Sequence, residues 1–186
     1  FHLDRLVEAG LLDVSYARLT GRTGPGAGRP AKLYRRSRVT VAVSFPRRSY
    51  DLVGGVLASA LERTLHGGDA ARALHEEARA RGRALGASYH GQGDDLDRAS
   101  GALAEEGFEP RRDGGELCLH NCPFDALAEE HAELVCGVNL DLVSGVLDGL
   151  ECASVRARLQ PDGDHCCVRV STAGAHTAPT SSRGDT

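Results

Sequence analysis

The chain contains 186 residues, with 22 Lys and Arg side chains, 26 Asp and Glu side chains and a formal net charge of −4. This length suits one or two domains, and the scarcity of aromatic residues predicts a core built mostly from Leu, Val and Ala. No apolar run approaches the ~18 residues of a membrane span, and no secretory signal pattern is visible. We therefore expect a cytoplasmic protein without a membrane partner.

The charge is divided unevenly along the chain. Residues 1–50 hold ten Lys and Arg against three Asp and Glu, whereas residues 51–186 hold twelve against twenty-three. A basic module joined to an acidic one is typical of a DNA-binding head with a separate sensing body. The mild acidity of the whole chain therefore does not exclude double-stranded DNA as a partner.

The start of the chain predicts a helix followed by a hairpin. Apolar residues at helical spacing indicate a helix that ends near Gly10. Alternating apolar residues then predict a strand over residues 12–19, and a second short strand is expected at Leu33 and Tyr34. The loop between the two strands is rich in Gly, Pro and basic residues and contains no acid.

The composition of this loop suggests two binding roles, a phosphate-binding loop and a DNA-binding wing. Gly24, Gly26 and Gly28 are closely spaced, but a phosphate-cradling GxGxxG loop follows a strand and opens a helix. Here Pro30 and a strand follow, so nucleotide binding is set aside. The order of helix, turn and basic hairpin instead resembles the second half of a winged helix-turn-helix, whose wing lies along the DNA backbone. An ordinary solvated hairpin with a charged edge is the alternative.

The winged-helix interpretation identifies candidate DNA contacts, because Arg and Lys on a wing replace counterions at the phosphates. The predicted DNA-binding residues are His2, Arg5, Arg18, Arg22, Arg29, Lys32 and Arg35. The chain has no Met and begins inside a helical pattern. We therefore expect that the upstream helices of this domain, with most of the base-reading residues, are missing.

The remainder predicts a helical body with two β-hairpins. After a short strand or linker at 40–46, helices are expected at 50–66 (capped by Ser49), 69–85 (capped by Asp69), 94–106 (begun by acidic residues from Asp94), from Pro123, and at 132–150. Hairpins are expected to turn at residues 113–115 and 161–163. The fold class is therefore α+β, with a truncated winged-helix head over 1–40, a sensor and dimerisation domain over 41–171, and a disordered tail over 172–186.

Two helices of the body carry apolar faces. The face of the 50–66 helix consists of Leu52, Val53, Val56, Leu57, Ala60 and Leu61, and the stripe of the 132–150 helix consists of Leu134, Val135, Val138, Leu142 and Val146. Because winged helices read symmetric operators, we expect the second stripe to mediate a homodimer.

Six cysteines lie in the last third of the chain, at Cys118, Cys122, Cys136, Cys152, Cys166 and Cys167. Without a secretory signal, clustered thiols indicate a metal or redox role more than disulfides, although small buried hydrophobic residues are the alternative. The absence of a CxxC pair argues against a zinc ribbon, whereas iron–sulfur clusters accept irregular spacings. Cys152 stands apart at a helix end and is expected to be structural.

A broader resemblance covers roughly residues 1–170. The segments HLDRLVEAGLL, GPGAGRPAKLYRR, HNCPFDALAEEHAELVCGVNL and HCCVRV are similar to actinobacterial ArsR-like winged-helix regulators, and among them to the iron–sulfur cluster assembly (Suf operon) repressor family. The resemblance implies a dimeric transcriptional repressor in which a 4Fe–4S or 2Fe–2S cluster controls DNA binding. The implied ligands are Cys118, Cys122, Cys136 and Cys166, with Cys167 as the alternate for Cys166.

Two other functions were weighed. A thiol oxidoreductase is disfavoured because the chain lacks CxxC, a GxSxG elbow and a His pair at metal spacing on one helix, so we expect no enzyme. A winged-helix regulator without metal, whose body only dimerises or binds a small ligand, stays open as the alternative.

Overall fold

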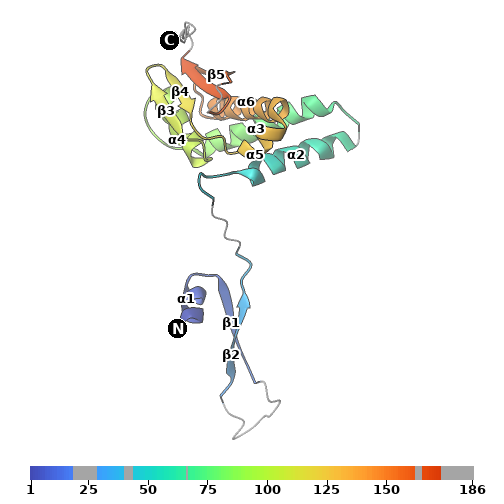
Figure 1. Ribbon diagram of the computed structural model, residues 1–186, viewed down its shortest axis with the longest axis vertical. Helices are drawn as coiled ribbons and strands as arrows, with labels where there is room; N and C mark the ends of the chain where they lie inside the picture. The colour runs from blue at the N-terminus through green and yellow to red at the C-terminus, as the bar shows by residue number, and fades with distance from the viewer. Residues whose placement is uncertain (19–28, 40–43, 66, 162–164, 173–186) are drawn as a thin grey trace, which may run out of the picture. The chain divides into compact units, whose positions relative to one another are not determined.

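The computed structural model describes residues 1–18, 29–39, 44–65, 67–161 and 165–172. Contacts divide the chain into two units, Phe1–Val43 and Ser44–Thr186, and each is described here by itself. The fold class is α+β, as predicted (Figure 1). The predicted disordered tail, beyond residue 172, lies outside the described residues.

The first unit is a helix followed by a two-stranded sheet. Helix α1 (His2–Glu8) ends before Gly10, whose φ of +72° is the left-handed conformation that glycine adopts readily after a helix. Strands β1 (Leu12–Ala17) and β2 (Ala31–Arg36) pair in antiparallel register. The predicted order of helix and hairpin is confirmed, whereas the predicted glycine-rich tip lies outside the described residues.

The second unit contains five helices in its described residues. They are α2 (Tyr50–Leu65), α3 (Ala70–Ser88), α4 (Asp95–Glu105), α5 (Asp125–Glu130) and α6 (Ala132–Gly149). The carboxylates of Asp69 and Asp94 accept hydrogen bonds from the first-turn amides of α3 and α4. Asp69 is therefore the predicted N-cap of α3, and Asp94, which was expected inside the first turn, is the N-cap of α4. The segments predicted from apolar periodicity are therefore helices.

Glycines bring α3 and α6 into backbone contact. A Cβ atom on Gly82 would lie 2.0 Å from the carbonyl oxygen of Leu142, and one on Gly145 would lie 2.2 Å from that of Arg79. Gly86 and Gly149 repeat this arrangement one turn further along. Only glycine permits so close an approach, so the α3–α6 pair forms the rigid axis of the unit.

The second sheet joins both predicted hairpins. Strands β3 (Pro110–Asp113), β4 (Glu116–Leu119), β6 (Val168–Thr172) and β5 (Val155–Leu159) lie side by side in that order, all antiparallel. The link between the hairpins is the β4–β6 pairing. One face of the sheet is buried in the core, where Leu117, Leu119, Val168 and Val170 are at most 1 % exposed.

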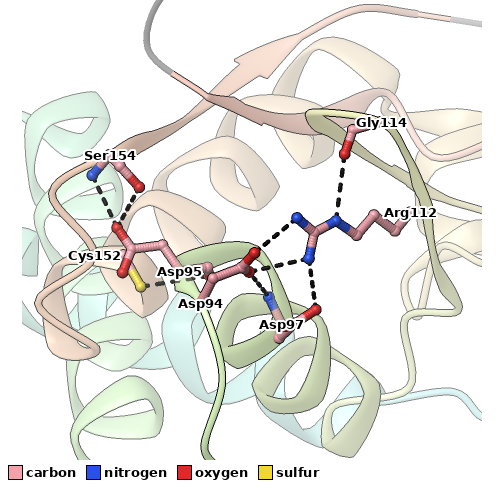
Figure 2. A network of polar contacts seen from close by, with 7 residues as sticks. All are labelled: Asp94, Asp95, Asp97, Arg112, Gly114, Cys152 and Ser154. Atoms are coloured by element: carbon pink, nitrogen blue, oxygen red, sulfur yellow. Dashed lines mark hydrogen bonds and ion pairs between the residues drawn. The ribbon is translucent and has the colours of Figure 1, made fainter.

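A polar network fixes the start of α4 against the sheet side of the unit (Figure 2). Arg112 of β3 donates hydrogen bonds to Asp94 at 2.7 Å and to Asp97 at 2.7 Å. Next to them, Asp95 accepts hydrogen bonds from the backbone and hydroxyl of Ser154. Both links join distant segments, so the acidic first turn of α4 serves tertiary packing as well as the helix dipole.

Several local predictions were wrong. The hydroxyl of Ser49 donates to the Glu106 carbonyl at 2.8 Å instead of capping α2, and helix α5 begins at Asp125, two residues after Pro123. Residues 44–46 form no strand, which agrees with the linker alternative for 40–46, and residues 40–43 lie outside the described residues. On α2, Leu57 and Leu61 of the predicted core face are exposed.

The apolar stripe of α6 is not a dimer surface. Val135, Val138, Leu142 and Val146 are all at least 96 % buried within the core of the unit, and only Leu134 is exposed. The predicted helix is confirmed, but its apolar stripe is already buried against α3 and the sheet. A homodimer must therefore use a different surface.

Candidate functional site

The predicted cations of the first unit fall into two groups. Lys32 donates to the carboxylate of Asp4, which also accepts a hydrogen bond from the Tyr34 hydroxyl at 3.0 Å. Lys32 and Tyr34 together hold the pKa of Asp4 below its usual value. Lys32 thus ties β2 to α1, and its charge is already matched by an acid.

The other predicted contacts are more accessible. Arg18 and Arg29 are exposed and have no partner among the described residues, whereas Arg35 lies 3.7 Å from Asp13 in an exposed ion pair. His2 and Arg5 lie on α1, where the Arg5 guanidinium stacks over the ring of Phe1. Arg22 lies outside the described residues.

An open hollow near the base of the hairpin adds cations that the sequence prediction missed. It is lined by Arg35, Arg36 and Arg38 together with Gly10, and Asp13 is the only acid in its lining. Three guanidinium groups around one hollow are suited to phosphate oxygens, because each presents a planar fork of donors. The one-signed run RRSR was the available signal in the sequence.

The second unit gathers thiols from two distant segments. Cys122 follows β4, and Cys166 and Cys167 precede β6, where the Cys166 amide donates to the Leu119 carbonyl at 3.0 Å. The neighbouring Cys166 thiol and burial raise the pKa of Cys122 far above its usual value. The Cys122 thiol lowers the pKa of Cys166, but Cys167 and burial outweigh it and raise that pKa to about 11.

A buried amide completes this thiol group. Asn139 of α6 is fully buried, and its Nδ2 lies 3.1 Å from the sulfur of Cys166. Its Oδ1 is also buried and has no hydrogen-bond partner among the described residues. An unsatisfied buried carbonyl costs stability, so this position favours a binding role over packing. The sequence signal was a polar residue inside the apolar stripe of α6.

The two remaining predicted ligands, Cys118 and Cys136, occupy different positions relative to this thiol group. Cys118 of β4 is on the sheet face opposite Leu117 and Leu119, where it accepts a hydrogen bond from Arg169 at 3.0 Å. Cys136 precedes Asn139 by three residues, so the two lie on the same side of α6 about one turn apart. The structure therefore brings Cys122, Cys166 and Cys167 together and separates Cys118 from them.

Cys152 occupies a third environment. It is 7 % exposed, and its thiol lies 3.7 Å from the Asp95 carbonyl, next to the network of Figure 2. Burial raises its pKa to about 11. Cys152 packs against the start of α4, and no contact joins it to the other thiols among the described residues.

The donor chemistry of the thiol group fits a thiolate-bound metal centre. All six cysteines are free, and the group combines three soft sulfur donors with a buried amide that can donate to sulfur. Within the described part of the chain, no three or more His, Cys, Asp or Glu side chains stand ready as ligands around one point. Metal binding would therefore require the thiols to lose protons and close together.

Comparisons with known protein families, with curated proteins and with solved structures find no match. In the described residues, no helix combines the length and apolar character needed to cross a membrane. The basic hairpin and the thiol group are therefore the two features of the chain that bear on function.

Proposed function

We propose that this chain is a winged-helix transcriptional repressor that binds double-stranded DNA through its first unit and binds an iron–sulfur cluster through the thiols of its second. The observation that carries this proposal is that the two units present different kinds of candidate site. One presents a basic hairpin to solvent, and the other buries free thiols beside an unsatisfied amide. A regulator needs both a contact surface and a separate sensing site.

On the DNA side, the hairpin supplies phosphate contacts. Arg29 is the first described residue after the glycine-rich loop. Arg35, Arg36 and Arg38 surround the hollow at the base of the hairpin. Such contacts fix the position of a protein on DNA and release counterions, but they carry little base specificity. Lys32 has an internal role, because it holds α1 against β2 through Asp4.

On the sensing side, we assign the cluster to Cys122, Cys166 and Cys167, with Cys136 as the fourth thiol. Cys167 replaces Cys118, since Cys118 lies across the sheet beside Arg169. The Asn139 amide donates to sulfur and thereby stabilises the thiolate form of Cys166. When bound, an iron–sulfur cluster supplies a centre that responds to iron supply and oxidants.

A second copy of the chain is the proposed partner of α2. Its solvent side carries an apolar stripe at spacings of three and four residues, formed by Tyr50, Gly54, Leu57, Ala58, Leu61 and Leu65. Leu61 and Leu65 are 60 % and 71 % exposed, and the stripe contains no charge. A helix of this length presents a seam about 24 Å long. The same seam on a second copy is its complement in a two-fold dimer, which symmetric operators require.

Salt dependence of DNA binding tests the proposed function. Arg22→Ala combined with Arg29→Ala should reduce the magnitude of the slope of log K against log salt by about 1.8, because each phosphate contact contributes roughly 0.9. Affinity should fall for all duplexes alike. Arg63→Ala with Arg72→Ala, which removes the same charge from the second unit, should leave the slope unchanged. Equal slopes for all three proteins would refute the wing assignment.

A further inference from the structure

The chain enters the second unit through a segment that is fastened to the Cys122 loop. Arg48 donates from Nη1 to the carbonyl oxygen of Cys122 at 2.8 Å and to Oδ1 of Asn121 at 2.6 Å. Its Nη2 donates to the carboxylate of Asp125 at 2.9 Å. One guanidinium thus binds two residues of the loop between β4 and α5 and the first residue of α5.

Further hydrogen bonds connect the same two segments. The Asn121 amide donates to the Arg47 carbonyl at 3.0 Å and to the Gly107 carbonyl at 2.5 Å. The backbone amide of Ser49 donates to the Pro123 carbonyl at 3.1 Å. Asn121 is 6 % exposed, so its hydrogen bonds are shielded from water, whereas the Asp125 side chain is half exposed. We define this arrangement as the Arg48 latch: residues 47–49 on one side and residues 121–125 on the other.

Cys122 belongs to the latch and to the thiol group at once. Its carbonyl oxygen accepts a hydrogen bond from Arg48, while its thiol lies beside Cys166, which raises the pKa of Cys122. The carbonyl and the side chain belong to one residue of the same short loop. A backbone shift that repositions the thiol would therefore also move the carbonyl that Arg48 holds.

We propose that Arg48 couples the state of Cys122 to the segment that leads back to the first unit, so that metal binding at the thiols loosens the latch. This inference rests on the proposed function of the thiol group and adds the route by which that group regulates. The acceptors of Arg48 are fully engaged while the thiols are free. When the thiols close around an ion, a backbone shift of Cys122 would lengthen the bond between its carbonyl and Arg48. Residues 44–49, which precede α2 in the chain, would then be held less firmly.

Reciprocity gives a second consequence. If binding at Cys122 weakens the latch, then weakening the latch must make Cys122 easier to engage. Arg48 is thus a positioning residue for the thiol site, although it contacts the Cys122 carbonyl and not its sulfur. Lysine at this position keeps the charge but loses the planar fork, so Arg48→Lys should give an intermediate effect.

Hydrogen exchange of the anaerobic full chain tests the proposal, with Cd²⁺ as the thiol-binding probe. Upon Cd²⁺ binding, amides in residues 44–49 of the wild type should exchange about tenfold faster, the effect of losing one charge-assisted bond. In Arg48→Ala these amides should exchange fast already and not respond to Cd²⁺. Arg63→Ala, which removes an arginine paired with Glu76 and Glu77 on the surface, is the matched control.

A metal-free arm makes the test complete. Arg48→Ala should speed alkylation of Cys122 by iodoacetamide about tenfold, whereas that of Cys152 should not change. Unchanged exchange in wild type despite thiolate–cadmium absorption would overturn the proposal, as would unchanged Cys122 alkylation in Arg48→Ala. If Cd²⁺ does not bind at all, the cluster of the proposed function fails, and the alkylation arm still decides the latch.

Discussion

The two units differ most in what they bury. In the first unit, helix α1 has no buried residue, and Phe1 is 87 % exposed. In the second, Leu103, Leu117 and Val143 are completely buried in one continuous core. The first unit is therefore held by strand pairing and by the contacts of Asp4, whereas the second has the core of an independently stable domain.

This difference shows where function-related side chains are found in each unit. The first unit exposes its cations, so its candidate contacts lie on the surface and cost little stability. The second unit buries polar side chains in its core, and the two buried amides, Asn121 and Asn139, lie at the latch and at the thiol group. A polar side chain buried in the core needs hydrogen-bond partners. Asn121 finds them in the Arg47 and Gly107 carbonyls, whereas the amide nitrogen of Asn139 contacts the sulfur of Cys166.

The largest effect should come from the glycine contact between α3 and α6. Gly145→Ala places a methyl group 2.2 Å from the Arg79 carbonyl, so the helices must separate, and the second unit should lose about 3 kcal/mol of stability. Its melting temperature should fall by about 10 °C. In helix α2 of the same unit, a Cβ atom at Gly55 would meet open space. Gly55→Ala should therefore stabilise the unit by about 0.5–1 kcal/mol. Thermal unfolding by circular dichroism measures both, and equal effects would disprove the close packing.

A smaller change is expected at the exposed stripe of α2. Leu57→Glu with Leu61→Glu should raise the dimer dissociation constant at least about 100-fold, because carboxylates cannot be buried in an apolar seam. Analytical ultracentrifugation measures the constant. The exposed Leu134 of α6 provides the control, and Leu134→Glu should leave the dimer intact. Dissociation caused by Leu134→Glu alone would move the interface to α6.

The smallest effect on stability is expected from substituting the two buried amides. This comparison is also the most informative about the core. Asn139→Leu removes an unsatisfied carbonyl, so unfolding free energy should rise by about 1 kcal/mol while Cd²⁺ affinity falls. Asn121→Leu removes an amide with three hydrogen bonds and should destabilise the unit instead. Urea denaturation compares the two variants. Loss of stability in Asn139→Leu would mean that this amide is structural.

Local patterns predicted most of the secondary structure. The helices at 69–85 and 94–106 follow from apolar spacing and from the Asp residues that cap them, which are short-range signals. On the predicted face of α2, Leu57 and Leu61 are exposed, whereas the other four residues, Leu52, Val53, Val56 and Ala60, are buried as predicted. The helix has two neighbouring apolar faces, and only its contact with α3 decides which one is buried. Likewise, periodicity identified the stripe of α6 but not what covers it.

The thiol group shows the same limit. Alternation along β4, which is a local property with a period of two, explains why Cys118 lies on the face opposite the buried Leu117 and Leu119, whereas Cys166 is itself buried. Their separation depends on the β4–β6 pairing, which places Cys118 opposite Arg169. Asn139 and the Arg48 latch were missed because both depend on contacts between segments far apart in the sequence.

The most direct test of the central claim is analysis of iron and acid-labile sulfide, with visible absorption, on the anaerobically purified full chain. The account predicts a brown protein that contains iron and sulfide, a Cys122→Ser variant that is colourless, and a Cys152→Ser variant that keeps its colour. Colour retained by Cys122→Ser and lost by Cys152→Ser would contradict the ligand assignment. A wild type that never takes up iron would contradict the cluster itself and favour a regulator without metal.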